Sequence, residues 1–161
     1  MKNPRESAAY TFGYNPALFA RRVHDILTVV KLTRESEPAP DSVCLVGVDG
    51  AGPWVAAARA QAGDAIDRAV VDTGGFRFGK VLDIHDPNFL PGGAKYFDLP
   101  GMIALNAPGR LALAGEGDKA PEVVTTVYQA AGAADRLVTF TGDAAKIRDA
   151  AVKWLLGQAP N

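Results

Sequence analysis

Four short apolar runs, each followed by a segment with helical patterning, constrain the fold of this chain more than any other feature. The runs span residues 42–47, 66–72, 110–114 and 136–141. Continuous apolar runs of this length are typical of strands that are buried on both faces of a parallel sheet. Strands that alternate with helices predict an α/β fold, with a parallel sheet of about four strands joined by right-handed crossover helices.

The helices are predicted from apolar spacing and from the residues at their ends. The first opens at Asn15-Pro16, because Asn is a good N-cap and Pro suits the first helical turn. It ends before Pro38 and Pro40. Further helices are expected at residues 53–62, around 99–105, at 121–131 and at 143–156, the last of them capped by Asp143 or Thr141.

Length and composition indicate one globular domain. The chain has 161 residues, of which 48% are hydrophobic and 22% charged, and this is enough to bury a sizeable core. We expect an N-terminal arm at residues 1–14, which carries three aromatic side chains (Tyr10, Phe12 and Tyr14), and a domain at residues 15–161. The net charge of −1 provides no basic surface for nucleic acid or an anionic membrane.

Other compositional features exclude several kinds of site. Cys44 is the single cysteine, so no intrachain disulfide forms and a small buried side chain is expected there. The two histidines, His24 and His85, lack metal-ligand spacing, and neither a metal nor a cofactor is predicted. The first residues contain no apolar stretch and no segment has the length of a membrane span, which favours a cytoplasmic location.

Two glycine-rich turns follow predicted strands in a way that is typical of hydrolases. Residues 47–51 read Gly-Val-Asp-Gly-Ala and have the strand, tight turn and helix of a nucleophile elbow. Residues 115–118 read Gly-Glu-Gly-Asp and occupy the place of a triad acid. Residues 10–157 resemble the C-terminal half of an α/β-hydrolase. The resemblance rests on these two turns and on the stretches 51–54, 70–78, 88–96 and 98–101. The most similar group is the bacterial acetyl-xylan-esterase and dienelactone-hydrolase-like esterases.

The resemblance implies a protein related to carboxylic-ester hydrolases, acting on a small ester. Asp49 then stands at the nucleophile position, Gly50 supplies an oxyanion N–H, Asp118 is the orienting acid and His85 is a substitute base. The chain departs from the family in two places, because Asp49 replaces the serine of the esterases and residues 141–144 contain no histidine. A carboxylate nucleophile without a base would turn over poorly, so activity is expected to be weak or lost.

Each candidate residue also has a structural interpretation. Asp49 is a common residue in turns, and Gly50 relieves strain there. His85 lies in a long irregular segment and braces it or is solvated, while Asp118 caps or precedes a helix. Three carboxylates, those of Asp49, Asp72 and Asp118, are expected at one edge of the sheet. Their spacing in the sequence is not that of a metal motif. The competing hypothesis is therefore a non-catalytic, dimeric hydrolase-like binding or interaction module.

A sheet that contains only the second half of such a fold has an open edge. The strand at residues 42–47 would be central in a complete hydrolase, whereas here it has no earlier strand beside it. Unpaired apolar edges associate with other chains unless they are covered. We therefore expect a homodimer that forms through the Val43–Val46 edge, the uncovered face of the sheet, or both, with the aromatic arm helping to cover it.

Overall fold

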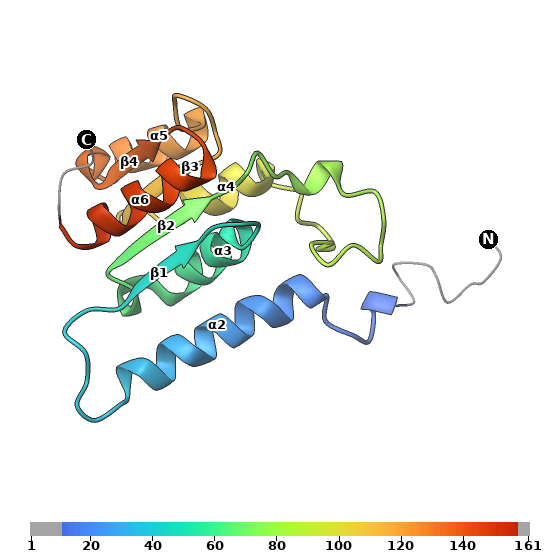
Figure 1. The fold of residues 1–161 in the computed structure, drawn as a ribbon. Helices are drawn as coiled ribbons and strands as arrows, with labels where there is room; N and C mark the ends of the chain where they lie inside the picture. The colour runs from blue at the N-terminus through green and yellow to red at the C-terminus, as the bar shows by residue number, and fades with distance from the viewer. Residues whose placement is uncertain (1–10, 158–161) are drawn as a thin grey trace.

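The computed structural model describes residues 11–157 and contains a parallel sheet with helices on both faces (Figure 1). Its strands are β1 (Cys44–Gly47), β2 (Arg68–Asp72), β3 (Arg110–Ala114) and β4 (Leu137–Phe140). They lie side by side in the order in which they occur in the chain, and every neighbouring pair is parallel. The prediction of an α/β fold with about four parallel strands is confirmed.

The helices are divided unequally between the two faces of the sheet. The main helices are α2 (Leu18–Arg34), α3 (Gly52–Ala62), α4 (Asp98–Ala104), α5 (Glu122–Ala130) and α6 (Ala144–Leu155). Each crossover connects neighbouring strands, and crossovers of one hand place α3, α4 and α5 on the same face. In Figure 1, α6 lies in front of the sheet, with α3 and α4 behind it.

Alternating side chains of the central strands fill two cores. One core lies under α3, α4 and α5 and contains Ala69, Val71, Leu111 and Leu113. The other lies under α6 and contains Val70, Ala112, Ala114 and Phe140. Strands β2 and β3 are thus buried on both faces, which is why their sequences are continuously apolar. Strand β1 differs, because Val46 remains 43% exposed on the α6 side.

The beginning of the first long helix differs from the prediction. Helix α2 starts at Leu18 rather than at Asn15, its N-cap is Ala17, and no side chain caps it. The Asn15 side-chain amide instead donates to the carbonyl of Thr11 at 3.1 Å. Helix α6 begins as predicted, since the Asp143 carboxylate accepts the backbone N–H of Lys146 at 2.9 Å.

The described part of the aromatic arm does not cover β1. Phe12 stacks on Phe89, with ring centroids 5.2 Å apart, and so packs on the segment between β2 and α4. Tyr14 is 89% exposed, and Tyr10 lies outside the described residues. The expectation that the arm helps to cover the open edge is therefore not supported by Phe12 or Tyr14.

The long segment between β2 and α4 is fixed to the helices by Trp54. This half-buried side chain of α3 donates from Nε1 to Asn88 Oδ1 at 2.9 Å. The guanidinium of Arg22, on α2, lies 4.1 Å from the centre of its ring. Trp54 thus joins α2, α3 and the segment as a packing residue. Within residues 11–157, no helix combines the length and apolar character needed to cross a bilayer.

Ionisation of Tyr128 is expected to lower the stability of the folded protein at alkaline pH. Its side chain is fully buried in α5 and its hydroxyl donates to the Gly109 carbonyl at 2.9 Å. Burial raises the pKa of Tyr128 from 10.0 to about 12, so its contribution is complete below the pKa of the unfolded chain and is lost as the pH rises through the folded value. We expect this group to remove about 2 to 3 kcal/mol from the free energy of unfolding across that range.

Urea denaturation across the alkaline range tests this expectation. Tyr128→Phe should be less stable by about 1 kcal/mol at neutral pH, because the Gly109 carbonyl loses its donor. Its stability should then fall less steeply than that of the wild type above pH 10. Parallel pH profiles for the two proteins would contradict the assignment.

Candidate functional site

The loops that follow the strands meet at the carboxyl edge of the sheet, where open α/β sheets bind their ligands. This edge carries Asp49 after β1, Asp72 at the end of β2, and Glu116 and Asp118 after β3. It therefore contains the acidic residues singled out from the sequence, and also one that was not. Their surroundings determine what chemistry each can perform.

The turn after β1 has the compact geometry expected from its sequence. Asp49 has φ of 52° and Gly50 has φ of 91°, both in the left-handed region that few residues other than glycine adopt. The N–H of Ala51 closes the turn by donating to the Val48 carbonyl at 3.0 Å. Helix α3 starts immediately afterwards, at Gly52, so strand, tight turn and helix follow one another as predicted.

Two glycines allow α3 to approach the sheet closely. A Cβ on Gly52 would lie 1.9 Å from the carbonyl oxygen of Asp72 in β2. A Cβ on Gly47 would lie 2.8 Å from the Gly52 Cα and 2.9 Å from the Val55 side chain. Gly50, by contrast, has no heavy atom within 4 Å of its Cβ position. Gly50 is therefore required by the backbone conformation of the turn, whereas Gly47 and Gly52 are required by the close packing of α3 on the sheet.

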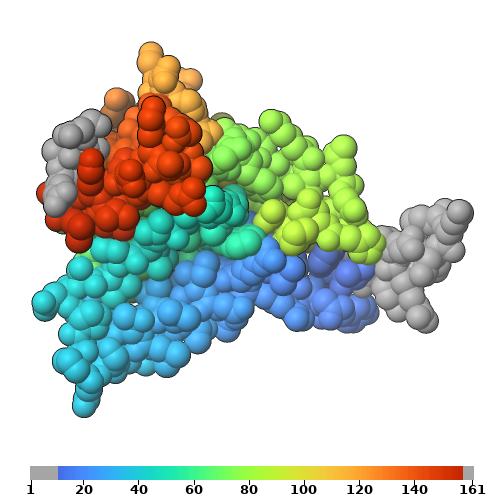
Figure 2. Space-filling model, in the orientation of Figure 1, coloured from blue at the N-terminus to red at the C-terminus, as the bar shows by residue number. Residues whose placement is uncertain are grey.

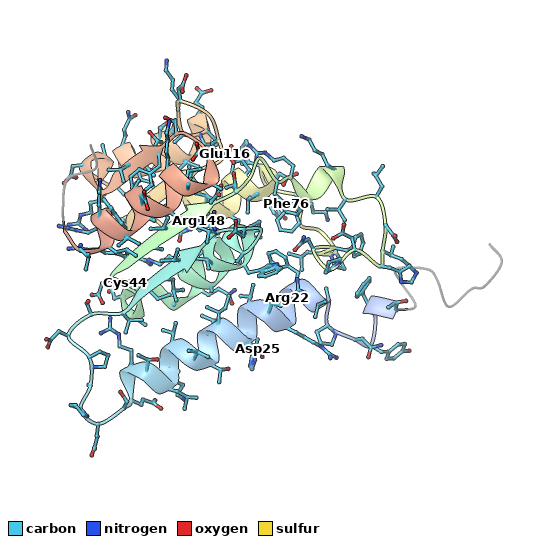
Figure 3. All side chains as sticks on the ribbon, in the orientation of Figure 1. Arg22, Asp25, Cys44, Phe76, Glu116 and Arg148 are labelled. Carbon is cyan, nitrogen blue, oxygen red and sulfur yellow. The ribbon has the colours of Figure 1, made fainter. Side chains whose placement is uncertain are left out.

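The carboxylate of Asp49 faces an arginine. Arg148 in α6 places Nη1 3.3 Å from Asp49 Oδ2, and the two side chains are 54% and 64% exposed. Figure 3 labels Arg148 where α6 passes over the sheet. An exposed pair of this kind contributes at most about 1 kcal/mol. Because guanidinium stays protonated and accepts no hydrogen bonds, Arg148 cannot serve as a general base for Asp49.

The structure does not join Asp49, His85 and Asp118 by hydrogen bonds. The backbone N–H of His85 donates to Asp83 Oδ1 at 2.9 Å in an exposed turn, but its ring has no hydrogen bond or ion pair with any described residue. The exposed carboxylate of Asp118 also has no such partner among residues 11–157. A triad requires its members in hydrogen-bond contact, so these residues do not form one here.

Asp118 lies in a bend that precedes helix α5, and Asp72 ends β2, as expected. Helix α5 has Pro121 as its N-cap and no side-chain cap, so Asp118 does not cap it. Asp72 accepts the N–H of Gly74 at 3.0 Å and closes a turn. Within the described ranges, no three His, Cys, Asp or Glu side chains gather as a bound metal would require. The acidic strand ends therefore provide no visible cation site in this part of the chain.

Glu116 is the acidic residue that sequence reasoning missed. Its side chain is only 5% exposed and pairs with Arg77, whose Nη1 donates to Oε1 at 2.9 Å and whose Nη2 donates to Oε2. The Thr73 hydroxyl donates to the same Oε1 at 2.6 Å. Hydrogen bonding to Glu116 raises the pKa of Arg77. Figure 3 labels Glu116 at the end of the sheet where the loops after β2 and β3 meet.

This cluster ties two loops together. Arg77 and Thr73 belong to the loop after β2, while Glu116 follows β3. Gly115 brings the loops into contact, since its Cβ would lie 2.3 Å from the backbone nitrogen of Gly74. Both oxygens of Glu116 accept bonds from a cation or a hydroxyl, so the carboxylate braces the loops and is not available to transfer protons. The resemblance directed attention to Asp118, and only the fold reveals the Arg77 partner.

Comparison with protein-family models, with curated proteins and with solved structures finds no match to this chain.

Proposed function

We propose that this chain is an α/β-hydrolase-like module, related to carboxylic-ester hydrolases, that acts by pairing with a second copy rather than by ester hydrolysis. The observation that carries the proposal is the open edge of β1, where Val46 is 43% exposed. Strand β1 is bonded on one side only, to β2, in the part of the chain that is described. The environment of Asp49 adds independent support.

Ester hydrolysis by an aspartate nucleophile needs a base that activates water against the covalent intermediate. The side chain in contact with Asp49 is Arg148, which supplies positive charge but no proton acceptor. Within residues 11–157, the His85 side chain forms no hydrogen bond or ion pair with Asp49. This arrangement favours a turn residue over a nucleophile at position 49.

The variant Asp49→Ala distinguishes the proposed binding module from a weak esterase. The alternative function, weak ester hydrolysis, is supported by the tight turn after β1, in which Asp49 has a φ of 52° as a nucleophile elbow requires. We expect wild type and Asp49→Ala to hydrolyse p-nitrophenyl acetate at the same rate, equal to that of Asp118→Ala. A rate that falls about tenfold in Asp49→Ala, equivalent to about 1.4 kcal/mol in the barrier, would contradict the proposal and restore Asp49 as a catalytic residue.

The backbone of β1 presents unpaired groups to solvent at alternate residues. The N–H of Asp67 donates to the Val43 carbonyl at 2.9 Å, so Val43 directs its polar backbone groups toward β2. In a parallel pair, alternate residues direct these groups to opposite sides. The N–H and C=O groups of Cys44 and Val46 therefore point to the open edge, where another strand can bond to them.

The other edge of the sheet is less suited to association. Strand β4 exposes Thr139 and directly follows the charged pair Asp135 and Arg136, and charges and polar residues are common protection for edge strands. Residues 42–47 contain no charged side chain. An uncharged edge that exposes valine favours pairing at β1 rather than at β4.

Helix α6 extends the apolar surface beside β1. Its side chains Val152 and Leu156 are 57% and 71% exposed. Beyond them, Leu155 and Leu156 line a hollow of about 380 Å³ whose other lining residues are mainly polar or charged, namely Ser42, Cys44, Asp67, Arg68 and Arg110. Two copies related by a two-fold axis would pair β1 with β1 in antiparallel fashion and cover Val46 of each copy. The sheet would then continue through both protomers.

Val46→Pro tests this pairing without disturbing β2. Proline removes an N–H that points to the open edge, and it is tolerated at the edge of a sheet. We expect the wild type to sediment as a dimer and Val46→Pro as a folded monomer. The dissociation constant of the dimer should rise at least about tenfold in Val46→Pro. Val46→Thr, which keeps the N–H and the branched side chain, should remain dimeric. A wild type that is monomeric at all concentrations would contradict the proposal.

A further inference from the structure

The helical layer contains an apolar groove that the proposed function does not use. One hollow of about 470 Å³ lies between α4, α5 and residues 90–97, and another of about 500 Å³ lies between α2, α3 and α4. Both are lined by Leu90, Met102 and Leu105, so they meet over α4. We call this continuous surface the α4 groove. Each hollow has the size of a small-molecule binding site.

Carbon side chains dominate the lining. Phe97, Val123 and Val127 contribute to the first hollow, and Phe19, Val23 and Leu27 to the second. Helix α4 has 7 residues, against 11 in α3 and 9 in α5, so the helical layer is incomplete above it. Leu105, directly after α4, is consequently 70% exposed. An exposed apolar surface of this kind is typical of a binding site.

A strained segment holds two aromatic rings at the rim of the groove. Tyr96, Phe97 and Asp98 have φ values of 54°, 70° and 58°, which is costly for bulky residues and is found where the surroundings enforce it. The Asp98 carboxylate enforces it by accepting the N–H groups of Phe78, Gly79 and Leu99 at 2.7, 2.8 and 2.6 Å. Tyr96 and Phe97 are thereby kept 87% and 75% exposed.

Few polar groups line the groove, and one of them is a cation. Lys95 lines the first hollow, whereas His24 and Gln61 line the second. Asp98 also lines the first hollow, but its carboxylate is engaged by three backbone N–H groups. The exposed ammonium of Lys95 is therefore the charge available to a ligand at that end.

We propose that the α4 groove binds a fatty carboxylate. An unbranched acyl chain requires no hydrogen bonds, which suits an elongated surface lined by carbon, and its single carboxylate complements Lys95. Leu90, Met102 and Leu105 would contact the middle of the chain. The aromatic rings of Tyr96 and Phe97 would cover it near the Lys95 end. The site is separate from the β1 edge, so binding does not depend on dimerisation.

Calorimetric titration with octanoate, decanoate and dodecanoate tests the site. Burial of each added pair of methylenes should tighten binding about tenfold. Leu105→Asp should weaken dodecanoate binding by at least about tenfold, because it places a carboxylate among the methylenes. Leu32→Asp is the matched control, since Leu32 is 63% exposed and lies outside the groove lining, and its affinity should equal that of the wild type.

Further variants distinguish the contribution of the ligand carboxylate from that of its acyl chain, and test whether binding depends on the dimer. Lys95→Met should weaken decanoate binding but leave decanol binding unchanged. Val46→Pro should bind as the wild type does, whatever its oligomeric state. Absence of saturable binding, an affinity independent of chain length, or equal losses in Leu105→Asp and Leu32→Asp would overturn the proposal. A change from dimer to monomer in Leu105→Asp would overturn it as well, in favour of a protein interface.

Discussion

Gly52→Ala is expected to lower the free energy of unfolding by about 3 kcal/mol or more, the upper range of overpacking effects. The added methyl group would lie 1.9 Å from the Asp72 carbonyl oxygen and 2.5 Å from its carbon. Both atoms belong to the backbone of β2, which cannot rotate away as a side chain can. Helix α3 would have to move away from the sheet, and the core formed by Val55, Ala56 and Ala69 would open.

Chemical denaturation monitored by the fluorescence of the two tryptophans, Trp54 and Trp154, measures this loss. Gly50→Ala is the informative control, because its methyl group meets no atom within 4 Å although φ is 91°. That variant should cost only the strain of a left-handed alanine, about 1 to 2 kcal/mol. If the two variants were equally stable, close packing of α3 on β2 would not be what Gly52 provides.

Glu116→Ala is expected to lower the free energy of unfolding by about 3 kcal/mol. It leaves the Arg77 guanidinium and the Thr73 hydroxyl without the partner that now accepts from both. Arg77 is 27% exposed, so water compensates part of the loss, and the effect should lie at the lower end of the range for broken buried pairs. The loops after β2 and β3 should loosen together, with faster amide exchange at Gly74 and Gly75.

Asp118→Ala provides the comparison within the same loop. Its exposed carboxylate has no hydrogen-bond or ion-pair partner among the described residues, so the change should alter stability by no more than about 0.5 kcal/mol. Glu116→Gln should fall between the two, because an amide keeps one acceptor oxygen but loses the charge. A larger cost for Asp118→Ala than for Glu116→Ala would show that the acidic residue important to this loop had been misidentified.

The sheet could be predicted from sequence because its physical signal is local. The runs Arg68–Asp72 and Arg110–Ala114 are apolar at every central position, as burial on both faces requires. The glycine-rich turn at Asp49 and the helix that begins just after it are equally local. The cap at Asp143, one of the two that the sequence predicts, is local as well, since its bond to Lys146 spans three residues.

The environment of the candidate site could not be predicted because it depends on distant parts of the chain. Asp49 meets Arg148, 99 residues away, and Glu116 meets Arg77, 39 residues away. No sequence pattern announces such pairs, because a charge reveals its partner only after the strands are ordered. The start of α2 was placed wrongly for another reason: Asn15 bonds backward to Thr11 instead of capping the helix ahead.

Shape, too, depends on the completed fold. Figure 2 shows the molecule from the side of α6, with the surface of residues 42–50 beside it. The sequence predicts an open edge at β1, and the structure agrees within residues 11–157, where β1 pairs with β2 alone. The groove above α4 was not anticipated, because it results from the length of a helix and from the strained backbone at Tyr96 and Phe97.

Amide hydrogen exchange at Cys44 and Val46 tests the central claim most directly, because these N–H groups point to the open edge of β1. If two copies pair through this edge, both amides should exchange slowly in concentrated protein and rapidly in dilute protein, while Leu45, bonded within the protomer, stays protected in both. Rapid exchange at Cys44 and Val46 in concentrated protein would show that no further strand bonds to the open edge of β1, and the proposal that two copies associate there would be wrong.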